Sequence, residues 1–377
     1  MKLEIAHPHA DDLSADMGSY GRYGRYGRYG LLRRAALAAA AAALLLVAVV
    51  LGIAIGETDI SASTVFQVLA QQLWGASYGQ GTLPPLDPIT QGIVWNYRLP
   101  RALVAGSCGA GLAISGVILQ SLLRNALAEP YLLGISAGAS TGAVLVTVAG
   151  LGAGAISMTT GAFFGAVCAF ILVALLAHAA GQGGLRNSGQ IVLAGIAGSQ
   201  LFNALTSLII TKSGSAEQAR GIMFWLLGSL SGVRWPDTGL TAAVAGIGIL
   251  LCLLHARALD AFTFGSESAA ALGVPVRRVQ GTLLLAAALM TAVMVSIVGA
   301  IGFVGLVIPH AARLLVGVRH RRLIPASALM GAVFLIAADV LSRTLITGQV
   351  LPIGVITALV GAPVFALILL QSSRGRA

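Results

Sequence analysis

Charged side chains are scarce in this sequence. Only 10% of its 377 residues are Asp, Glu, Lys or Arg, whereas 57% are hydrophobic. A soluble domain carries about 25% charged residues, so a soluble fold of this composition would expose much apolar surface to water. The deficit excludes a soluble protein. It makes the bilayer span, about 20 apolar residues per helix, the natural unit for dividing the chain.

The sequence also lacks the common motifs of catalysis and nucleotide binding. It contains neither GxxxxGKS nor GxxxxGKT, and its two lysines, Lys2 and Lys212, do not follow glycine-rich loops. A chain without that motif cannot cradle ATP phosphates in this way. HExxH is absent as well. We therefore expect a protein that is not an enzyme.

Cysteine is rare too, and its copies are widely separated. Cys108, Cys168 and Cys252 lie in or at the end of apolar runs, without a CxxC pair. This spacing excludes a zinc site or a disulfide framework and is typical of cysteine as a small apolar side chain. The six histidines form no close pair at metal-ligand spacing within a helix. No resident metal or cofactor is predicted.

Ionisable groups deep within the apolar runs are nearly absent, although ion-coupled carriers usually need them. Asp339 is the main candidate, and it can pair with Arg343 four residues later on one helix face. We favour this pairing over a proton-relay role. A chain with so little machinery for ion coupling or hydrolysis is expected to obtain its energy from a partner.

Apolar runs rich in small residues make up most of the chain. Glycine, with 48 copies, lets helix backbones approach closely in a membrane. The runs predict ten transmembrane helices, and so an all-α polytopic membrane protein. The predicted spans are 31–55, 99–122, 131–149, 156–180, 189–211, 236–255, 279–300, 303–317, 325–346 and 352–371.

Residues 1–30 differ in composition from the rest of the chain. They contain the repeat SYGRYGRYGRYG, which predicts a disordered basic tail before a membrane domain at 31–377. Contact of Arg22, Arg25 and Arg28 with anionic lipid is one interpretation, and a repeat expansion without function is the other. The net charge of +10 is spread between apolar runs, so no nucleic-acid partner is expected.

The distribution of Lys and Arg predicts the orientation in the membrane. With a cytoplasmic N-terminus, 17 of the 23 basic residues fall on the inside, in line with the positive-inside rule. Both termini are then cytoplasmic and the number of spans is even, a condition that eight or twelve spans also satisfy. The basic residues placed outside are Arg98, Arg101, Lys212, Arg220, Arg234 and Arg343.

The polar link at 261–279 lies on the predicted inside. Ser266 is a candidate N-cap for a short helix in this link, and Gly273 and Pro275 would end the helix. A short helix between two spans can serve as a docking surface for a soluble partner.

Four stretches of the sequence carry a family signature. They are RLPRALVAGSCGAGLAISGVILQSLLRNALAEPYLLGISAGAS at 98–140, FGSESAAALGV at 264–274, GAIGFVGLVIPHAARL at 299–314 and LPIGVITALVGAPVFALILL at 351–370. In this order they resemble the iron-chelate and cobalamin (FecCD-type) permeases of ABC importers. The resemblance covers nearly the whole chain after residue 31.

The resemblance implies a type II ABC importer permease fold of ten helices with an inverted repeat, and a homodimer in the bacterial inner membrane. Two separate ATPase subunits, which use the ATP, and a periplasmic substrate-binding protein are the implied partners, together with membrane lipid. The expected cargo is an iron chelate, either a ferric siderophore or haem. A cobalamin importer is the alternative, and an ion-coupled secondary carrier is a weaker one.

The resemblance also gives roles to particular residues. Arg98, Arg101 and Arg343 match arginines at the outer mouth that pair with carboxylates of the binding protein. Anchoring at the membrane interface would also explain them. The residues that match the coupling helix, which touches the ATPase, are Ser266, Glu267, Ser268, Ala269, Leu272 and Gly273.

Two gate segments are implied at the inner side of the path. Asn125 and Leu127 match one of them, and Asn187 and Ser188 align with the other. The chain departs from the family pattern beside the first gate, where Ala126 replaces a frequent proline. It departs in two further places, since Ser266 and Val350 stand where the family often has acidic residues.

Overall fold

The computed structural model describes residues 35–56, 58, 60–75, 86–150, 155–180, 188–212 and 216–374. The tail predicted at 1–30 lies outside these residues. By its internal contacts the chain divides into two units, Met1–Val47 and Ala48–Ala377. The described part of the first unit is helical.

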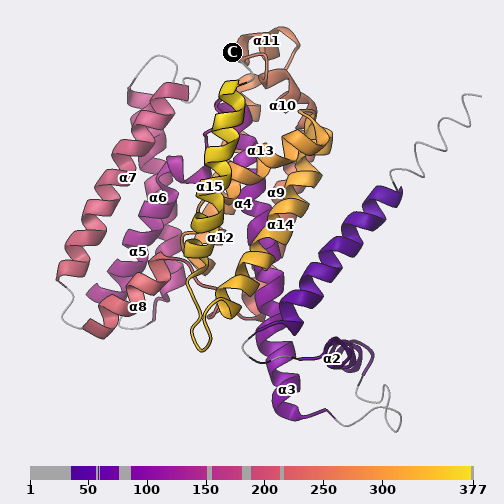
Figure 1. Ribbon diagram of the computed structural model, residues 1–377. Helices are drawn as coiled ribbons and strands as arrows, with labels where there is room; N and C mark the ends of the chain where they lie inside the picture. The colour runs from indigo at the N-terminus through magenta and orange to yellow at the C-terminus, as the bar shows by residue number, and fades with distance from the viewer. Residues whose placement is uncertain are drawn as a thin grey trace, which may run out of the picture. The chain divides into compact units, whose positions relative to one another are not determined.

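The described residues form helices and no β-strand (Figure 1). The first helix is Ala35–Ala54. The helices that follow are α2 (Ala62–Trp74), α3 (Pro88–Gly92), the π-helix η1 (Ile93–Arg98), α4 (Leu99–Leu122), the 3₁₀ helix η2 (Pro130–Leu133), α5 (Ile135–Ala149), α6 (Met158–Ala179), α7 (Ser188–Thr211), α8 (Ala216–Leu226), α9 (Trp235–Leu254), α10 (Ala256–Phe262), α11 (Ser266–Ala271), α12 (Val276–Val298), α13 (Val304–Val316), α14 (His320–Thr344) and α15 (Ile353–Arg374).

Among the described residues, seven helices are long and apolar enough to cross a membrane. They are the first helix, the continuous helix Pro88–Leu122, α6, α7, α9, α12 and α14. Three more, α5, α13 and α15, are apolar but shorter. Each of these helices corresponds to one predicted span, so the predicted all-α polytopic architecture is confirmed.

The second span is longer than predicted, because α3, η1 and α4 form one helix that begins at Pro88 rather than at residue 99. Asp87 caps its start: the carboxylate accepts hydrogen bonds from the N–H groups of Ile89 and Thr90, at 3.3 and 3.1 Å. Proline suits the first helical position, where its missing N–H costs nothing. Polar residues in this extension interrupt the apolar run, which is why the sequence indicated a later start.

Two sets of four consecutive helices show the same pattern of contacts between helices. The first set is α4, α5, α6 and α7, and the second is α12, α13, α14 and α15. In the first set α5 packs on α6 and α7, and in the second α13 packs on α14 and α15. Between the sets, α4 packs on α14, α12 packs on α6, and α4 contacts α12. An internal structural repeat produces this pattern of pairing.

Helices α4 and α14 touch along their backbones. A Cβ atom on Gly109 would overlap the carbonyl of Gly331, and a Cβ on Gly331 would overlap the carbonyl of Gly109. Small residues permit such close approach of helices in a membrane. Nearly every residue of α4 is buried, so this helix lies at the centre of the second unit.

Two irregular segments meet inside the bundle, at the starts of the short helices α5 and α13. The Tyr131 hydroxyl in η2 donates to the carbonyl of Ile301 and accepts from the N–H of Ile301, both at 2.7 Å. Gln120 of α4 donates to the carbonyls of Gly305 and Leu306, at 3.1 and 3.2 Å. Irregular backbone at membrane depth is tolerated where protein groups satisfy its hydrogen bonds, as they do here.

Candidate functional site

Arginines from two distant segments converge on one carboxylate. Arg101, in the first turn of α4, donates from Nε to Oδ1 of Asp339 at 2.8 Å. Arg343, in the last turn of α14, lies 3.1 Å from Oδ2 of the same carboxylate. The predicted i,i+4 pair of Asp339 and Arg343 is therefore confirmed. The contribution of Arg101, 238 positions away in the sequence, was not predicted.

The same arginine cluster holds the end of the first helix. Arg98 donates to the carbonyls of Ile53 and Ala54, at 2.9 and 3.0 Å, and Arg343 donates to the carbonyl of Gly52 at 2.8 Å. These carbonyls belong to the last turn of a helix, where they have no intrahelical partner. Cationic side chains satisfy such groups and match the negative end of the helix dipole.

Burial distinguishes these three arginines from residues of an open docking surface. Arg98, Arg101 and Arg343 are each 7% exposed, and Asp339 is 1% exposed. Their role in docking a binding protein stays a prediction. The contacts show that they join α4, α14 and the first helix within this chain. We call this end of α4 and α14 the arginine end.

An exposed arginine lies beside the buried cluster. Arg234 begins α9 and forms a capping box with Asp237, whose carboxylate accepts the Arg234 N–H at 2.8 Å. Its guanidinium stacks 4.9 Å from the ring centroid of Tyr97. Trp95 and Trp235 pack nearby, with ring centroids 4.9 Å apart. The sequence placed Arg234 on the outside but assigned it no function.

The first predicted gate lies in the loop that follows α4. The side-chain oxygen of Asn125 accepts a hydrogen bond from the N–H of Leu127 at 2.9 Å, which forms an Asx turn. Arg124, just before it, has a left-handed φ of 48°. Leu127 is exposed. The turn orders a loop in which Ala126 replaces the proline common in the family.

The second predicted gate is described only in part. Asn187 lies outside the described residues, and Ser188 is the first residue of α7. The assignment of these two residues to a gate therefore stays a prediction.

The predicted coupling residues at 266–273 fall on α11 and the turn after it, and α10 directly precedes them. We call α10 and α11 together the coupling segment, and it lies at the opposite end of the bundle from the arginine end (Figure 1). The N-cap of α11 is Gly265, with φ of 106°, so the prediction that Ser266 caps it is wrong. Glycine is favoured there because its φ is positive. Gly273, with φ of 82°, follows the helix as predicted.

The coupling segment presents apolar and acidic groups outward. Phe264 is 76% and Leu272 is 71% exposed, while Glu267 and Ser268 are also exposed. Ala269 is buried and holds α11 against the core. This mixture of apolar and charged groups on a short, well-terminated helix is suited to contact with a soluble protein.

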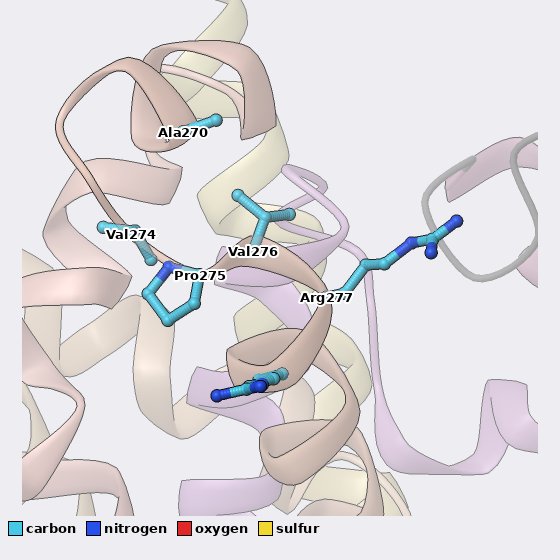
Figure 2. A pocket seen from close by; sticks show the side chains of 6 residues that line it. Ala270, Val274, Pro275, Val276 and Arg277 are labelled. Carbon is cyan, nitrogen blue, oxygen red and sulfur yellow. The ribbon is translucent and has the colours of Figure 1, made fainter.

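A shallow cavity of about 330 Å³ adjoins α11. Figure 2 shows Val274 and Pro275 in the turn from α11 into α12 and Val276 at the start of α12, with Ala270 of α11 nearby and Arg277 extending away. A second cavity, of about 400 Å³, is lined by the end of α8, Ala300 and the first turns of α15. Among the described residues, no group of three or more His, Cys, Asp or Glu side chains could hold a metal ion.

One polar cluster has no signal in the sequence. His320, at the start of α14, lies between Asp260 of α10 and Ser121 of α4. These residues come from three separate segments, and no spacing in the sequence connects them. Only the packing of α10 against α4 and α14 brings them together.

Comparison with known proteins identifies the family. The model of the FecCD transport family matches residues 44–371. The uncharacterized ABC transporter permease protein YvrB of Bacillus subtilis is 41% identical over 337 residues, covering 88% of this chain and 92% of the relative. The cobalamin import system permease protein BtuC of Halobacterium salinarum is 42% identical over 280 residues, covering 74% of this chain and 73% of the relative.

Other relatives carry names that refer to different cargoes. The hemin transport system permease protein HmuU of Yersinia pestis is 37% identical over 288 residues, covering 75% of this chain and 85% of the relative. The molybdate import system permease protein MolB of Haemophilus influenzae is 33% identical over 336 residues, covering 88% of this chain and 94% of the relative.

A solved structure has the same architecture. It is described as an inward-facing conformation of a metal-chelate type ABC transporter, and the comparison gives a TM-score of 0.74 and 30% sequence identity. The alignment covers 88% of this chain and 98% of the solved chain. The chain thus has the type II ABC importer permease fold. It belongs to the FecCD family of ABC importer permeases, non-catalytic membrane subunits whose ATPase is a separate protein.

Proposed function

We propose that this chain forms the translocation path of a binding-protein-dependent importer for an iron chelate, a ferric siderophore or haem. The observation that carries the proposal is the family match over residues 44–371, together with an exposed coupling segment of the expected sequence. Cobalamin is the second candidate cargo, because a relative named for cobalamin import is 42% identical to this chain.

In this proposal the chain works as a pair of copies in the bacterial inner membrane, with both termini in the cytoplasm. Two ATPase subunits bind the cytoplasmic coupling segments, and a binding protein delivers cargo at the periplasmic arginine end. The chain itself needs no cofactor, since ATP is used by the partner. The exposed Glu267, Phe264 and Leu272 provide the contact through which closure of the ATPase pair moves the bundle.

The path itself is expected to bind cargo weakly, since a tight site would trap it between turnovers. Asn125, Leu127, Asn187 and Ser188 are the proposed gate residues. The ion-coupled alternative is disfavoured by the contacts of Asp339, whose carboxylate is paired with Arg101 and Arg343. Both carboxylate oxygens are engaged in ion pairs that join α4 and α14, which is a structural use of this residue.

The test is uptake by proteoliposomes that contain the permease, its ATPase and its binding protein. The probes are a ferric hydroxamate siderophore, hemin, cyanocobalamin and molybdate, each supplied with and without ATP inside the vesicles. We expect ATP-dependent uptake of a ferric chelate. ATP-dependent uptake of cyanocobalamin alone would establish the second candidate. Uptake driven by an ion gradient without the ATPase would overturn the importer proposal.

A further inference from the structure

A chain of hydrogen bonds connects the coupling segment to two long helices. Asp260 of α10 accepts at Oδ1 from Nδ1 of His320 at 2.7 Å and from the backbone N–H of His320 at 2.9 Å. On the other side of the ring, Nε2 of His320 lies 2.7 Å from Oγ of Ser121 in α4. Three helices, α10, α14 and α4, are therefore joined through a single imidazole.

The position of Asp260 suits it to this role. The first N–H groups of a helix have no intrahelical partner and attract a negative charge. Asp260 satisfies one of them at the start of α14, although it belongs to another helix. Its own carbonyl accepts from the Thr263 hydroxyl in the turn towards α11, so its backbone is tied to the coupling segment.

Helices α4 and α14 behave as one antiparallel pair. Ser121 and His320 join them at one end, and Arg101 and Asp339 join them at the arginine end. Between these bonds, the backbones touch at Gly109 and Gly331. With 24 residues, α4 is about 36 Å long. Close-packed interiors transmit displacement rather than absorb it, so movement of one end is carried to the other.

We propose that Asp260 and His320 are positioning residues for coupling. They fasten the α10–α11 segment to the α4–α14 pair, so that a displacement imposed by the ATPase reaches the arginine end. The inference rests on the proposed importer function. It goes beyond that function by naming the joint in this chain through which the two ends communicate.

The experiment measures movement at the arginine end without any cargo. Leu345 is 60% exposed and follows directly after α14. A spin label is attached to L345C in a C168S background, because Cys168 is the exposed native cysteine whereas Cys108 and Cys252 are buried. The permease is assembled with its ATPase in nanodiscs, and the spectrum is compared with and without ATP plus vanadate. The labelled parent is expected to show a nucleotide-dependent change.

Variants of Asp260 and His320 then distinguish the hydrogen bond at Nδ1 of the imidazole from the one at Nε2. D260A removes both hydrogen bonds to α10, whereas D260N keeps an oxygen that can accept them. H320Q keeps an amide nitrogen near the position of Nε2 and loses the Nδ1 bond, and H320N does the reverse. Bonds to charged groups are worth enough to shift a conformational equilibrium about tenfold. We expect D260A and H320Q to lose most of the nucleotide response, and D260N and H320N to keep part of it.

Serine variants provide a matched control. Ser121 and Ser140 both donate to a carbonyl one turn earlier in their own helix, at 2.7 and 2.9 Å. Ser121 additionally contacts His320. S121A should therefore weaken the response at Leu345, and S140A should leave it at the parental level. This pair keeps the test decisive even if D260A fails to assemble.

The outcomes are distinguishable from failure of the importer proposal. If no ATPase assembles with the permease, the proposed function fails and this inference fails with it. If the ATPase assembles and hydrolyses ATP but the label at L345C does not respond, the inference alone is overturned. An equal response in the parent, D260A, H320Q and S121A also overturns it. Loss of the response with ATP hydrolysis retained supports it.

Discussion

Asp339 illustrates how much one buried carboxylate organises in this protein. It is 1% exposed and binds Arg101 and Arg343, which reach it from two helices. Ionic groups are expensive inside a membrane protein and persist when they are paired. The three arginines of the cluster, together with Asp339, thus connect α4, α14 and the end of the first helix.

The first prediction removes this carboxylate. D339N leaves two buried guanidiniums without their counter-charge, which typically costs about 3 kcal/mol or more. We expect a clear drop in the thermal unfolding midpoint of the permease in detergent. E217Q, a change at an exposed glutamate in the first turn of α8, is the control and should leave the midpoint unchanged. Equal midpoints for D339N and the parent would contradict the structural role.

A second prediction concerns docking of the binding protein. Reversal of Arg98, Arg101 and Arg343 to Glu should weaken its binding to permease in nanodiscs, because charges at such a site steer docking. The same variant should also have a lower unfolding midpoint, because these buried arginines hold Asp339 and the end of the first helix. R319E, at an exposed arginine beside the opposite end of α14, serves as the control. R234E tests whether the exposed Arg234, beside this cluster, also contributes to docking. Unchanged affinity in the triple variant, measured by biolayer interferometry, would refute the docking role.

At the scale of elements, the short helices α5 and α13 depend on contacts outside themselves. Both begin next to residues in the left-handed region, Gly134 with φ of 74° and Phe303 with φ of 69°. Their irregular approaches are held together by Tyr131 and Ile301. A non-glycine residue in that conformation is uncommon, and surrounding packing must hold it.

The third prediction tests this contact. Y131F removes the hydroxyl that satisfies both backbone groups of Ile301, and each unsatisfied buried group costs about 1–3 kcal/mol. We expect lower thermal stability and faster amide hydrogen exchange at residues 299–303. Y97F is the matched control, because it keeps the aromatic face that Arg234 stacks on. Identical exchange in Y131F and the parent would show that the hydroxyl is dispensable.

A fourth prediction addresses α11 as a docking element. Glu267 is exposed, so E267R should leave the fold intact while placing the wrong charge against the ATPase. We expect loss of the stimulation of ATP hydrolysis by the loaded binding protein. E217R, at the other exposed glutamate named above, is the control. Normal stimulation in E267R would exclude Glu267 from the coupling contact.

At the scale of the whole molecule, the two four-helix sets place the coupling segment and the arginine cluster at opposite ends of the α4–α14 pair. The fifth prediction follows from this arrangement and from the distribution of basic residues. In a C168S background, L272C should react with a membrane-impermeant maleimide only from the cytoplasm. L345C should react only from the periplasm. Both residues are exposed, so accessibility within the fold does not limit the reaction. Labelling of both from one side would overturn the proposed orientation.

The membrane class, the spans and the family follow from the sequence, because each depends on local composition or on residues close together in the chain. An apolar run predicts a span wherever it falls, and the i,i+4 spacing of Asp339 and Arg343 places them on one helix face. The end of α11 at Gly273 is local in the same way. The early start of the second span was missed because polar residues interrupt its apolar run.

Only the tertiary structure decided which of these residues act together. Arg101 meets Asp339, and His320 meets both Ser121 and Asp260, across long stretches of sequence. Burial of Arg98, Arg101 and Arg343 likewise depends on how the helices pack. Side-chain hydrogen bonds between helices require a particular depth and rotation of each helix. Those quantities are set by the packing of small residues over the whole bundle, and no local pattern encodes them.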